Sequence, residues 1–195
     1  MRENRYLKEK YNRMRTWSRI RLGVQQLIQR PYWNLLIFLA LGSFPVLKRI
    51  ANQMLLHMPV SEKLLPVFEI AMRMINVIVP ILLVFYIIQT IGEKTAEKEE
   101  ANIISAFIHV KVMNQPPILW SKKTDRRTGV TVREFYTNQP MYIWKEKMED
   151  IEDAFSGRLV GKKLEYGGKN HEDGKKIIMH MAKGRQGKDR GIMYE

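Results

Sequence analysis

The chain has 195 residues, no cysteine, and 33 Lys and Arg against 20 Asp and Glu, which gives a formal net charge of +13. This length holds one domain, or a small domain beside a membrane segment, and excludes a complete P-loop motor domain next to another sizeable part. The missing cysteines exclude a disulfide scaffold, a thiolate metal site and a cysteine nucleophile. The positive charge suits nucleic acid, acidic lipid or an acidic partner, so its distribution along the chain must decide among them.

Residues 1–30 form a basic arm. They contain nine Lys and Arg but only two acidic residues. Apolar residues recur at spacings of three and four, which predicts an amphipathic helix: Tyr6, Met14, Trp17, Ile20, Val24, Leu27 and Ile28. Such a helix can lie in a membrane interface, with Trp17 among the lipid headgroups and the arginines on anionic lipid.

Residues 31–92 contain two apolar runs, which predict a two-span transmembrane hairpin. The first run, residues 33–47, carries no charge and ends at Lys48 and Arg49. As a helix it extends over roughly 22 Å, which is shorter than the ~30 Å hydrocarbon core. Trp33, Lys48 and Arg49 are therefore expected to anchor its ends, because long basic side chains reach the interface. A re-entrant or interfacial segment is the alternative for this run.

The second run, residues 74–91, is free of charge over the length that a spanning helix requires. Pro80 lies inside it, where an internal proline can kink a helix. Glu69 and Arg73 precede the run four residues apart, a spacing that allows an ion pair. A pair at the water interface is favoured over a proton or ion pathway, which would need more than one such pair.

Basic residues favour a topology with both termini inside the cell. Nine of them precede the first run, whereas four lie between the two runs. The side with more Lys and Arg stays cytoplasmic, and two spans return the chain to that side. No small-x-small cleavage site follows the first run, so a cleavable signal peptide is not expected.

Residues 93–184 are predicted to form a small cytoplasmic α+β domain, and residues 185–195 a flexible tail. A helix follows the second run, and the stretches 118–123 and 130–137 are typical of two strands joined by a turn at Gly129. Pro140 opens another helix, which Gly157 could close. The stretches 163–166 and 175–183 are typical of a second hairpin. The order helix, hairpin, helix, hairpin suits a compact α+β fold.

No motif predicts catalysis, cofactor binding or a metal site. The run GRLVGKK, residues 157–163, has three residues between its glycines where a P-loop has four, and it precedes a strand instead of following one. A turn is its expected role. None of the four histidines has the spacing of metal ligands. We therefore predict that the chain is not an enzyme and has no cofactor.

Two groups of residues are candidates for contacts with partners. Basic residues of the first predicted hairpin could contact DNA phosphates or acidic lipid: Lys122, Lys123, Arg126 and Arg127. Trp144 and Phe155 share one face of the helix after Pro140 and could dock a motor or a neighbouring subunit.

Several sequence blocks of the domain carry a family likeness: PPILWSK (116–122), VREFYTNQP (132–140), WKEKMEDIEDAF (144–155), LEYG (164–167) and KIIMHMAKG (176–184). Together with a basic arm and two spans, they resemble the N-terminal, pre-motor region of FtsK/SpoIIIE-type DNA translocases, nearest the TcpA-type coupling ATPases of conjugative elements. The resemblance implies a homo-oligomer in the bacterial inner membrane. The family's Walker motifs are absent here, so no catalytic residue is carried over.

Two functions fit this layout. The first is a non-catalytic membrane anchor and assembly module of a DNA translocase or conjugative DNA-transfer machine, related to type IV secretion, which docks a motor ATPase at the membrane. The alternative is an envelope or secretion scaffold encoded by a phage or mobile element and unrelated to DNA transport. Both have the same topology.

Overall fold

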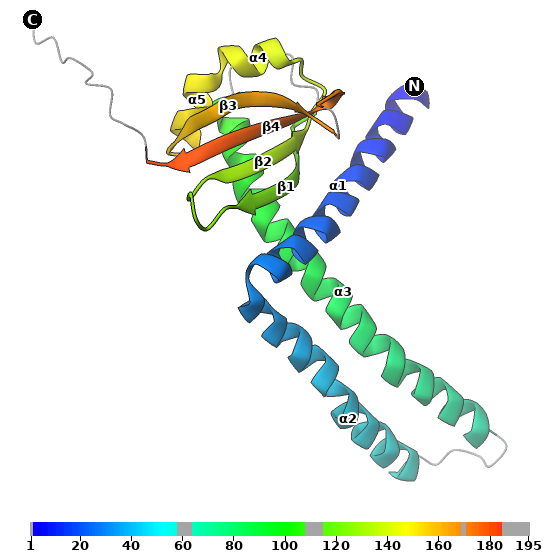
Figure 1. Cartoon of the computed structure of the whole chain (residues 1–195). Helices are drawn as coiled ribbons and strands as arrows, with labels where there is room; N and C mark the ends of the chain where they lie inside the picture. Colours follow the sequence, from blue (N-terminus) through cyan, green and yellow to red (C-terminus); the bar gives the residue numbers. More distant parts are fainter. Residues whose placement is uncertain (1, 58–63, 108–114, 169–170, 185–195) are drawn as a thin grey trace, which may run out of the picture.

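The computed structural model describes residues 2–57, 64–107, 115–168 and 171–184, so the predicted tail at 185–195 lies outside the described residues. A long helical part is followed by a small sheet with two short helices (Figure 1). The chain is thus α+β, as predicted. Its elements are α1 (Arg2–Gln29), the 3-10 turn η1 (Pro31–Trp33), α2 (Asn34–His57), α3 (Leu65–Ala106), β1 (Ile118–Thr124), β2 (Thr131–Tyr136), α4 (Met141–Glu146), α5 (Met148–Ala154), β3 (Gly157–Gly167) and β4 (Asp173–Lys183).

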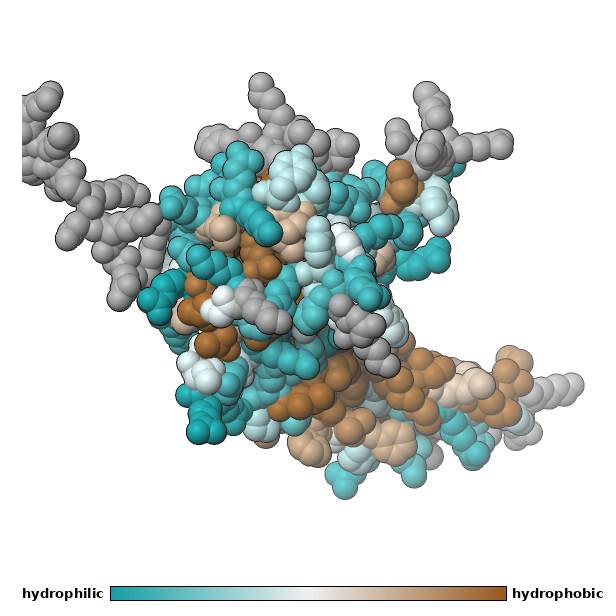
Figure 2. All heavy atoms as spheres, turned by 45° about the horizontal axis from the view of Figure 1, so that its top comes forward, coloured by the Kyte–Doolittle hydropathy of each residue, from teal (hydrophilic) through white to brown (hydrophobic). Residues whose placement is uncertain are grey.

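The helices α2 and α3 form an antiparallel hairpin (Figure 1), and both are long and apolar enough to cross a membrane. Only 11 % of the most apolar window of each helix is buried. Figure 2 shows apolar side chains gathered over this hairpin and hydrophilic ones over the sheet. The surface of the hairpin therefore needs lipid or further helices to cover it.

The helix α2 continues past Lys48 and Arg49 to His57. These two residues end only the charge-free run, and the helix continues beyond them. The physical reason is that residues 50–57 contain no glycine or proline, so nothing in the backbone chemistry stops the helix there.

The helix α3 is a single helix of 42 residues that runs through the predicted boundary at residue 92. The charge-free run 74–91 occupies the middle of this helix. In its C-terminal half, Ala96 and Ile103 belong to the core of the sheet domain. Hairpin and domain therefore share one continuous element.

The four strands form one antiparallel sheet in the order β1-β2-β4-β3, in which the pairing of β2 with β4 joins the two hairpins. Phe135 and Ile177 are register partners on its buried face, against which α3, α4 and α5 pack. Trp144 of α4 is fully buried at the centre, with its ring centroid 5.0 Å from that of Phe107 and 5.9 Å from that of Phe135. This corrects the expectation that Trp144 offers a docking surface, because its ring fills the core.

The strand β3 begins earlier than expected. The run GRLVGKK forms its first part, so it is a strand and not the expected turn. Ser156 adopts a φ of 48° just before it. Gly161 has a φ of 64° and lies where the pairing with β4 shifts register, between Leu159 and Leu164. A bulge of this kind lets a strand continue through an irregular segment.

Candidate functional site at the helix–sheet junction

The helices α1 and α3 cross at two glycines, where their backbones touch (Figure 1). A Cβ atom added to Gly92 would lie 1.8 Å from the carbonyl oxygen of Arg19, and one added to Gly23 would lie 2.0 Å from that of Ile88. Small residues allow helix backbones to approach this closely, and no larger side chain fits at either position. Leu22, next to Gly23, is fully buried. The crossing lies where the charge-free run of α3 ends.

Arg19 of α1 bridges two acidic residues of α3 beside this crossing. The residue is 1 % exposed. Its Nε lies 2.8 Å from Oε2 of Glu93, and its two terminal nitrogens lie 2.9 and 2.8 Å from the two oxygens of Glu100. Burial lowers the pKa of Arg19, but Glu100 and Glu93 outweigh burial, so the net pKa is raised and the group stays charged. Glu100 also accepts the backbone N–H of Leu119 at 2.8 Å, so its carboxylate joins α1, α3 and β1.

Glu99 forms a second buried ion cluster, beyond the charge-free run of α3. It pairs with Lys122 of β1 and with Arg133 of β2, whose Nε lies 2.6 Å from its Oε2. Burial raises the pKa of Glu99, but Arg133 and Lys122 outweigh burial, so the net pKa is below its ordinary value. The Arg133 guanidinium also lies 4.7 Å from the ring centroid of Phe155. The Glu99 carboxylate thus ties α3 to the buried face of the sheet.

The helix α1 also binds the edge of the sheet. Gln25 Nε2 donates to Ser121 Oγ at 3.1 Å, and Gln25 Oε1 accepts the Lys122 N–H at 3.3 Å. Gln29 Nε2 donates to the Lys122 carbonyl at 3.1 Å, and the Gln29 carbonyl accepts from Arg126 at 2.6 Å. These bonds make α1 part of the packed junction, although charge alone set residues 1–30 apart as an arm.

The four basic residues that the sequence predicts as contacts differ in their exposure in the structure. Lys122 is half-buried and pairs with Glu99, which corrects its place among the surface contacts. Lys123 and Arg127 are exposed. Arg126 is exposed too, but it is bonded to the end of α1. Only three of the four residues therefore present charge on the outer surface.

The anchoring residues lie at two levels of the hairpin. Trp33 lies at the end near the sheet, where α2 begins. Near the other end, Lys48 of α2 lines a cleft of about 390 Å³ together with Glu69 and Arg73 of α3, and Arg49 is exposed. The Glu69 and Arg73 side chains form an ion pair of 2.6 Å. Polar groups thus bracket the charge-free part of the hairpin at both ends.

Another side of α1 carries exposed apolar residues. Trp17 is 63 % exposed, and Val24 and Ile28 are exposed as well. Their spacings of seven and four place them on one side of the helix, away from the side on which Gln25 and Gln29 bind the sheet. The structure thus leaves Trp17 free to contact an apolar phase.

A cleft of about 490 Å³ opens where α1, α2, α3 and β1 meet. Cationic side chains line one part of it and apolar side chains the other. Sequence reasoning missed this cleft. The available signal was Lys94 and Lys98, because two lysines four residues apart, just after an apolar run, share one side of a helix. Among the described residues, no three Asp, Glu or His side chains gather in a group that could hold a metal ion.

No protein-family model matches the chain, and no curated protein is significantly similar to it. Among solved structures, the chain is similar to the pCW3 conjugation coupling protein TcpA, in a monomer form with ATPγS. The sequence identity is 21 %, the TM-score is 0.37, and the alignment covers 45 % of this chain and 24 % of that chain. The likeness is thus restricted to a part of each molecule.

Proposed function

We propose that this chain is a non-catalytic membrane anchor and assembly module of a DNA-transfer machine, which holds a motor ATPase at the bacterial inner membrane. The hairpin of α2 and α3 crosses the membrane, and both termini and the sheet domain lie in the cytoplasm. One observation carries the proposal: α3 belongs to the exposed apolar hairpin at one end and to the domain core at the other.

Continuity of α3 suits an anchor. A force applied to the sheet domain reaches the membrane segment along one hydrogen-bonded helix, with no flexible linker between them. The crossing at Gly23 and Gly92 and the Arg19 bridge fix α1 against the same helix. The joint therefore resists bending at the level where the chain leaves the membrane.

The direction of α1 supports the cytoplasmic placement of the domain. It crosses α3 instead of running alongside it (Figure 1), so it lies along the membrane surface when the hairpin spans the bilayer. Trp17, Val24 and Ile28 then contact the membrane interface. The nine Lys and Arg of residues 1–30 lie on the cytoplasmic side, which is the side that basic residues favour.

The assembly role and the DNA-transfer context have separate support. The exposed hairpin surface can contact further copies of the chain, so a homo-oligomer is part of the proposal. The DNA-transfer context rests on the resemblance of the sequence blocks between residues 116 and 184 to the pre-motor region of FtsK/SpoIIIE-type translocases. The motor itself belongs to a partner or to another part of a longer protein.

Cysteine accessibility tests the topology directly, because the chain has no native cysteine. Lys145 on α4 and Leu64 at the start of α3 are exposed and lie in opposite parts of the molecule. In intact cells an impermeant maleimide should label Leu64→Cys and should label Lys145→Cys only after lysis. Labelling of Lys145→Cys in intact cells would refute the cytoplasmic domain.

Assembly is tested with the full chain in mild detergent. We expect a particle larger than one copy by light scattering, and retention of a nucleotide-hydrolysing motor from cells that carry the transfer genes. A strictly monomeric particle that retains no ATPase would overturn the assembly role without affecting the topology.

A further inference from the structure

We infer that the cleft at the helix–sheet junction binds one anionic phospholipid, with the headgroup phosphate on its lysines and an acyl chain along its apolar side. This inference rests on the membrane insertion that the proposed function contains. The anionic phospholipid would be bound where α1, α2, α3 and β1 meet.

The polar part of the cleft carries an excess of positive charge: its described lining holds four cationic residues and one acidic residue, Glu99. Lys94 and Lys98 of α3 and Arg30 at the end of α1 line it. Within the described residues none of the three forms an ion pair, and the Arg30 guanidinium only donates to the Tyr32 hydroxyl at 3.4 Å. Lys122 also lines the cleft, but Glu99 neutralises it. Basic clefts next to spanning helices are places where anionic headgroups bind.

Gln26 adds an uncharged donor to this part. It lines the cleft and is 5 % exposed, and its side-chain amide makes no hydrogen bond with the described residues. The amide is not enclosed but opens onto the cleft, where a phosphate or glycerol oxygen would accept its N–H. The neighbouring hydroxyls of Thr90 and Thr95 donate to carbonyls of their own helix, so Gln26 is the amide left for a ligand.

The apolar part of the cleft points to a lipid and not to a soluble anion. Five of its residues are apolar or aromatic and belong to the membrane hairpin: Trp33, Leu36, Tyr86, Ile87 and Ile91. They continue into the exposed apolar surface of α2 and α3. A volume of about 490 Å³ lies within the roughly 300–1,000 Å³ of ligand clefts. A phospholipid matches this succession of cationic and apolar lining, whereas a free phosphate would use the polar part alone.

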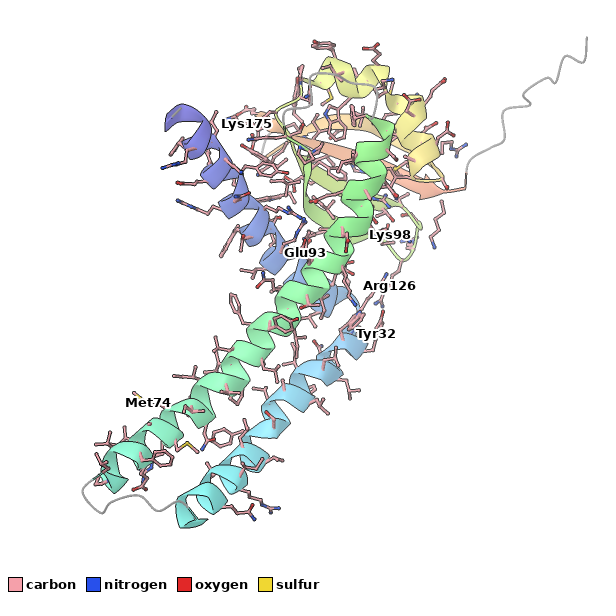
Figure 3. The ribbon with its side chains drawn as sticks, turned by 180° about the vertical axis from the view of Figure 1, so that it is seen from behind. Tyr32, Met74, Glu93, Lys98, Arg126 and Lys175 are labelled. Carbon is pink, nitrogen blue, oxygen red and sulfur yellow. The ribbon has the colours of Figure 1, made fainter. Side chains whose placement is uncertain are left out.

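The position of the cleft matches the depth of a headgroup. Figure 3 shows Lys98, Tyr32 and Arg126 on one side of α3, close to the end of α1, and Glu93 on the other side. The anionic residues Glu93 and Glu100 thus serve the Arg19 bridge and leave the cleft side cationic. Lys94 and Lys98 lie within seven residues after the charge-free run, where the hydrocarbon core gives way to headgroups.

Native mass spectrometry of the full chain in mild detergent tests the inference, with phosphatidylglycerol and phosphatidylcholine as probes. We expect phosphatidylglycerol to bind at least tenfold more tightly than phosphatidylcholine. The double substitution Lys94→Gln and Lys98→Gln should weaken phosphatidylglycerol binding roughly 25-fold, at roughly fivefold for each charge near the surface, and should leave phosphatidylcholine binding unchanged. The variant Lys94→Arg with Lys98→Arg should bind like the wild type, which shows that the positions tolerate substitution.

The matched control is Lys175→Gln with Lys183→Gln, which removes the same charge from exposed lysines of β4 that do not line the cleft. It should bind like the wild type. An equal loss in both glutamine variants, or no preference for phosphatidylglycerol, would overturn the inference. Competition by glycerol 3-phosphate at lipid-like concentrations would also overturn it, because a soluble headgroup makes no use of the apolar side.

Flotation with liposomes separates this inference from the proposed function. A wild-type chain that fails to float with phosphatidylcholine vesicles refutes membrane insertion, and both proposals fail together. A chain that inserts but does not distinguish the two lipids refutes the lipid site alone.

Discussion

Replacing Gly92 with alanine should force α1 away from α3. The new Cβ would lie 1.8 Å from the Arg19 carbonyl oxygen and 2.7 Å from its carbon, whereas ordinary van der Waals contact begins at 3.4 Å. Because the obstacle is backbone in a helix, no rotamer change relieves it. The two helices must therefore separate by about 1.6 Å at this point, the difference between 3.4 and 1.8 Å.

The energetic cost has three parts. Overpacking of this kind costs about 1–3 kcal/mol. Alanine in place of glycine returns about 1 kcal/mol through helix propensity. Separation also weakens the Arg19 bridge, in which Nε and Glu93 are 2.8 Å apart, and a broken buried pair costs about 3–5 kcal/mol. We expect a net loss of at least 2 kcal/mol, or roughly 4–8 °C in Tm for a chain of this size.

Thermal unfolding of the full chain in mild detergent, followed by near-ultraviolet circular dichroism, measures this loss. Gly42→Ala is the matched control, since Gly42 lies in α2 with nothing within 4 Å of its Cβ position. The control should melt at or slightly above the wild-type temperature. If Gly92→Ala melts within 1 °C of Gly42→Ala, the close crossing does not exist. Gly23→Ala should behave like Gly92→Ala, and the double variant should lose less than the sum, because both clashes separate the same helices.

Two further substitutions test the ion cluster and the core. Glu99→Gln leaves Arg133 and Lys122 without their anion and should cost about 2 kcal/mol at neutral pH. Because the pKa of Glu99 is lowered on folding, its ionised form contributes stability above pH 4.5, and this contribution is lost as the pH falls through the folded-state pKa. In urea unfolding, the difference in free energy of unfolding between the wild type and Glu99→Gln should therefore shrink in acid. A difference that stays constant with pH would contradict the pairing. Trp144→Ala should cost about 3–5 kcal/mol and Trp144→Phe clearly less, because the indole N–H has no partner in the core; equal losses would contradict a purely apolar role.

Local pattern was enough for much of this protein. The two charge-free runs and the residues around them predicted the apolar helices, because spanning length and hydropathy are properties of consecutive residues. Alternation of apolar residues, with Gly129 between the stretches, likewise predicted the strands β1 and β2 within about one residue of their observed bounds. The sequence alone also showed that over half of the net charge lies in residues 1–30.

Other features needed the tertiary structure, because they depend on which residues meet across the chain. The helical spacing of Trp144 suits either a core residue or a docking face. Only the packing of its helix against the sheet shows that it belongs to the core. Arg19 and Lys122 look like surface charges until Glu100 and Glu99 of α3 are brought against them. The cleft at the helix–sheet junction joins residues of α1, α2, α3 and β1 that are distant in sequence, so only the folded chain brings them together. The sequence by itself thus determined the apolar and charged segments. Tertiary packing decided which of the charged side chains are paired and which remain free.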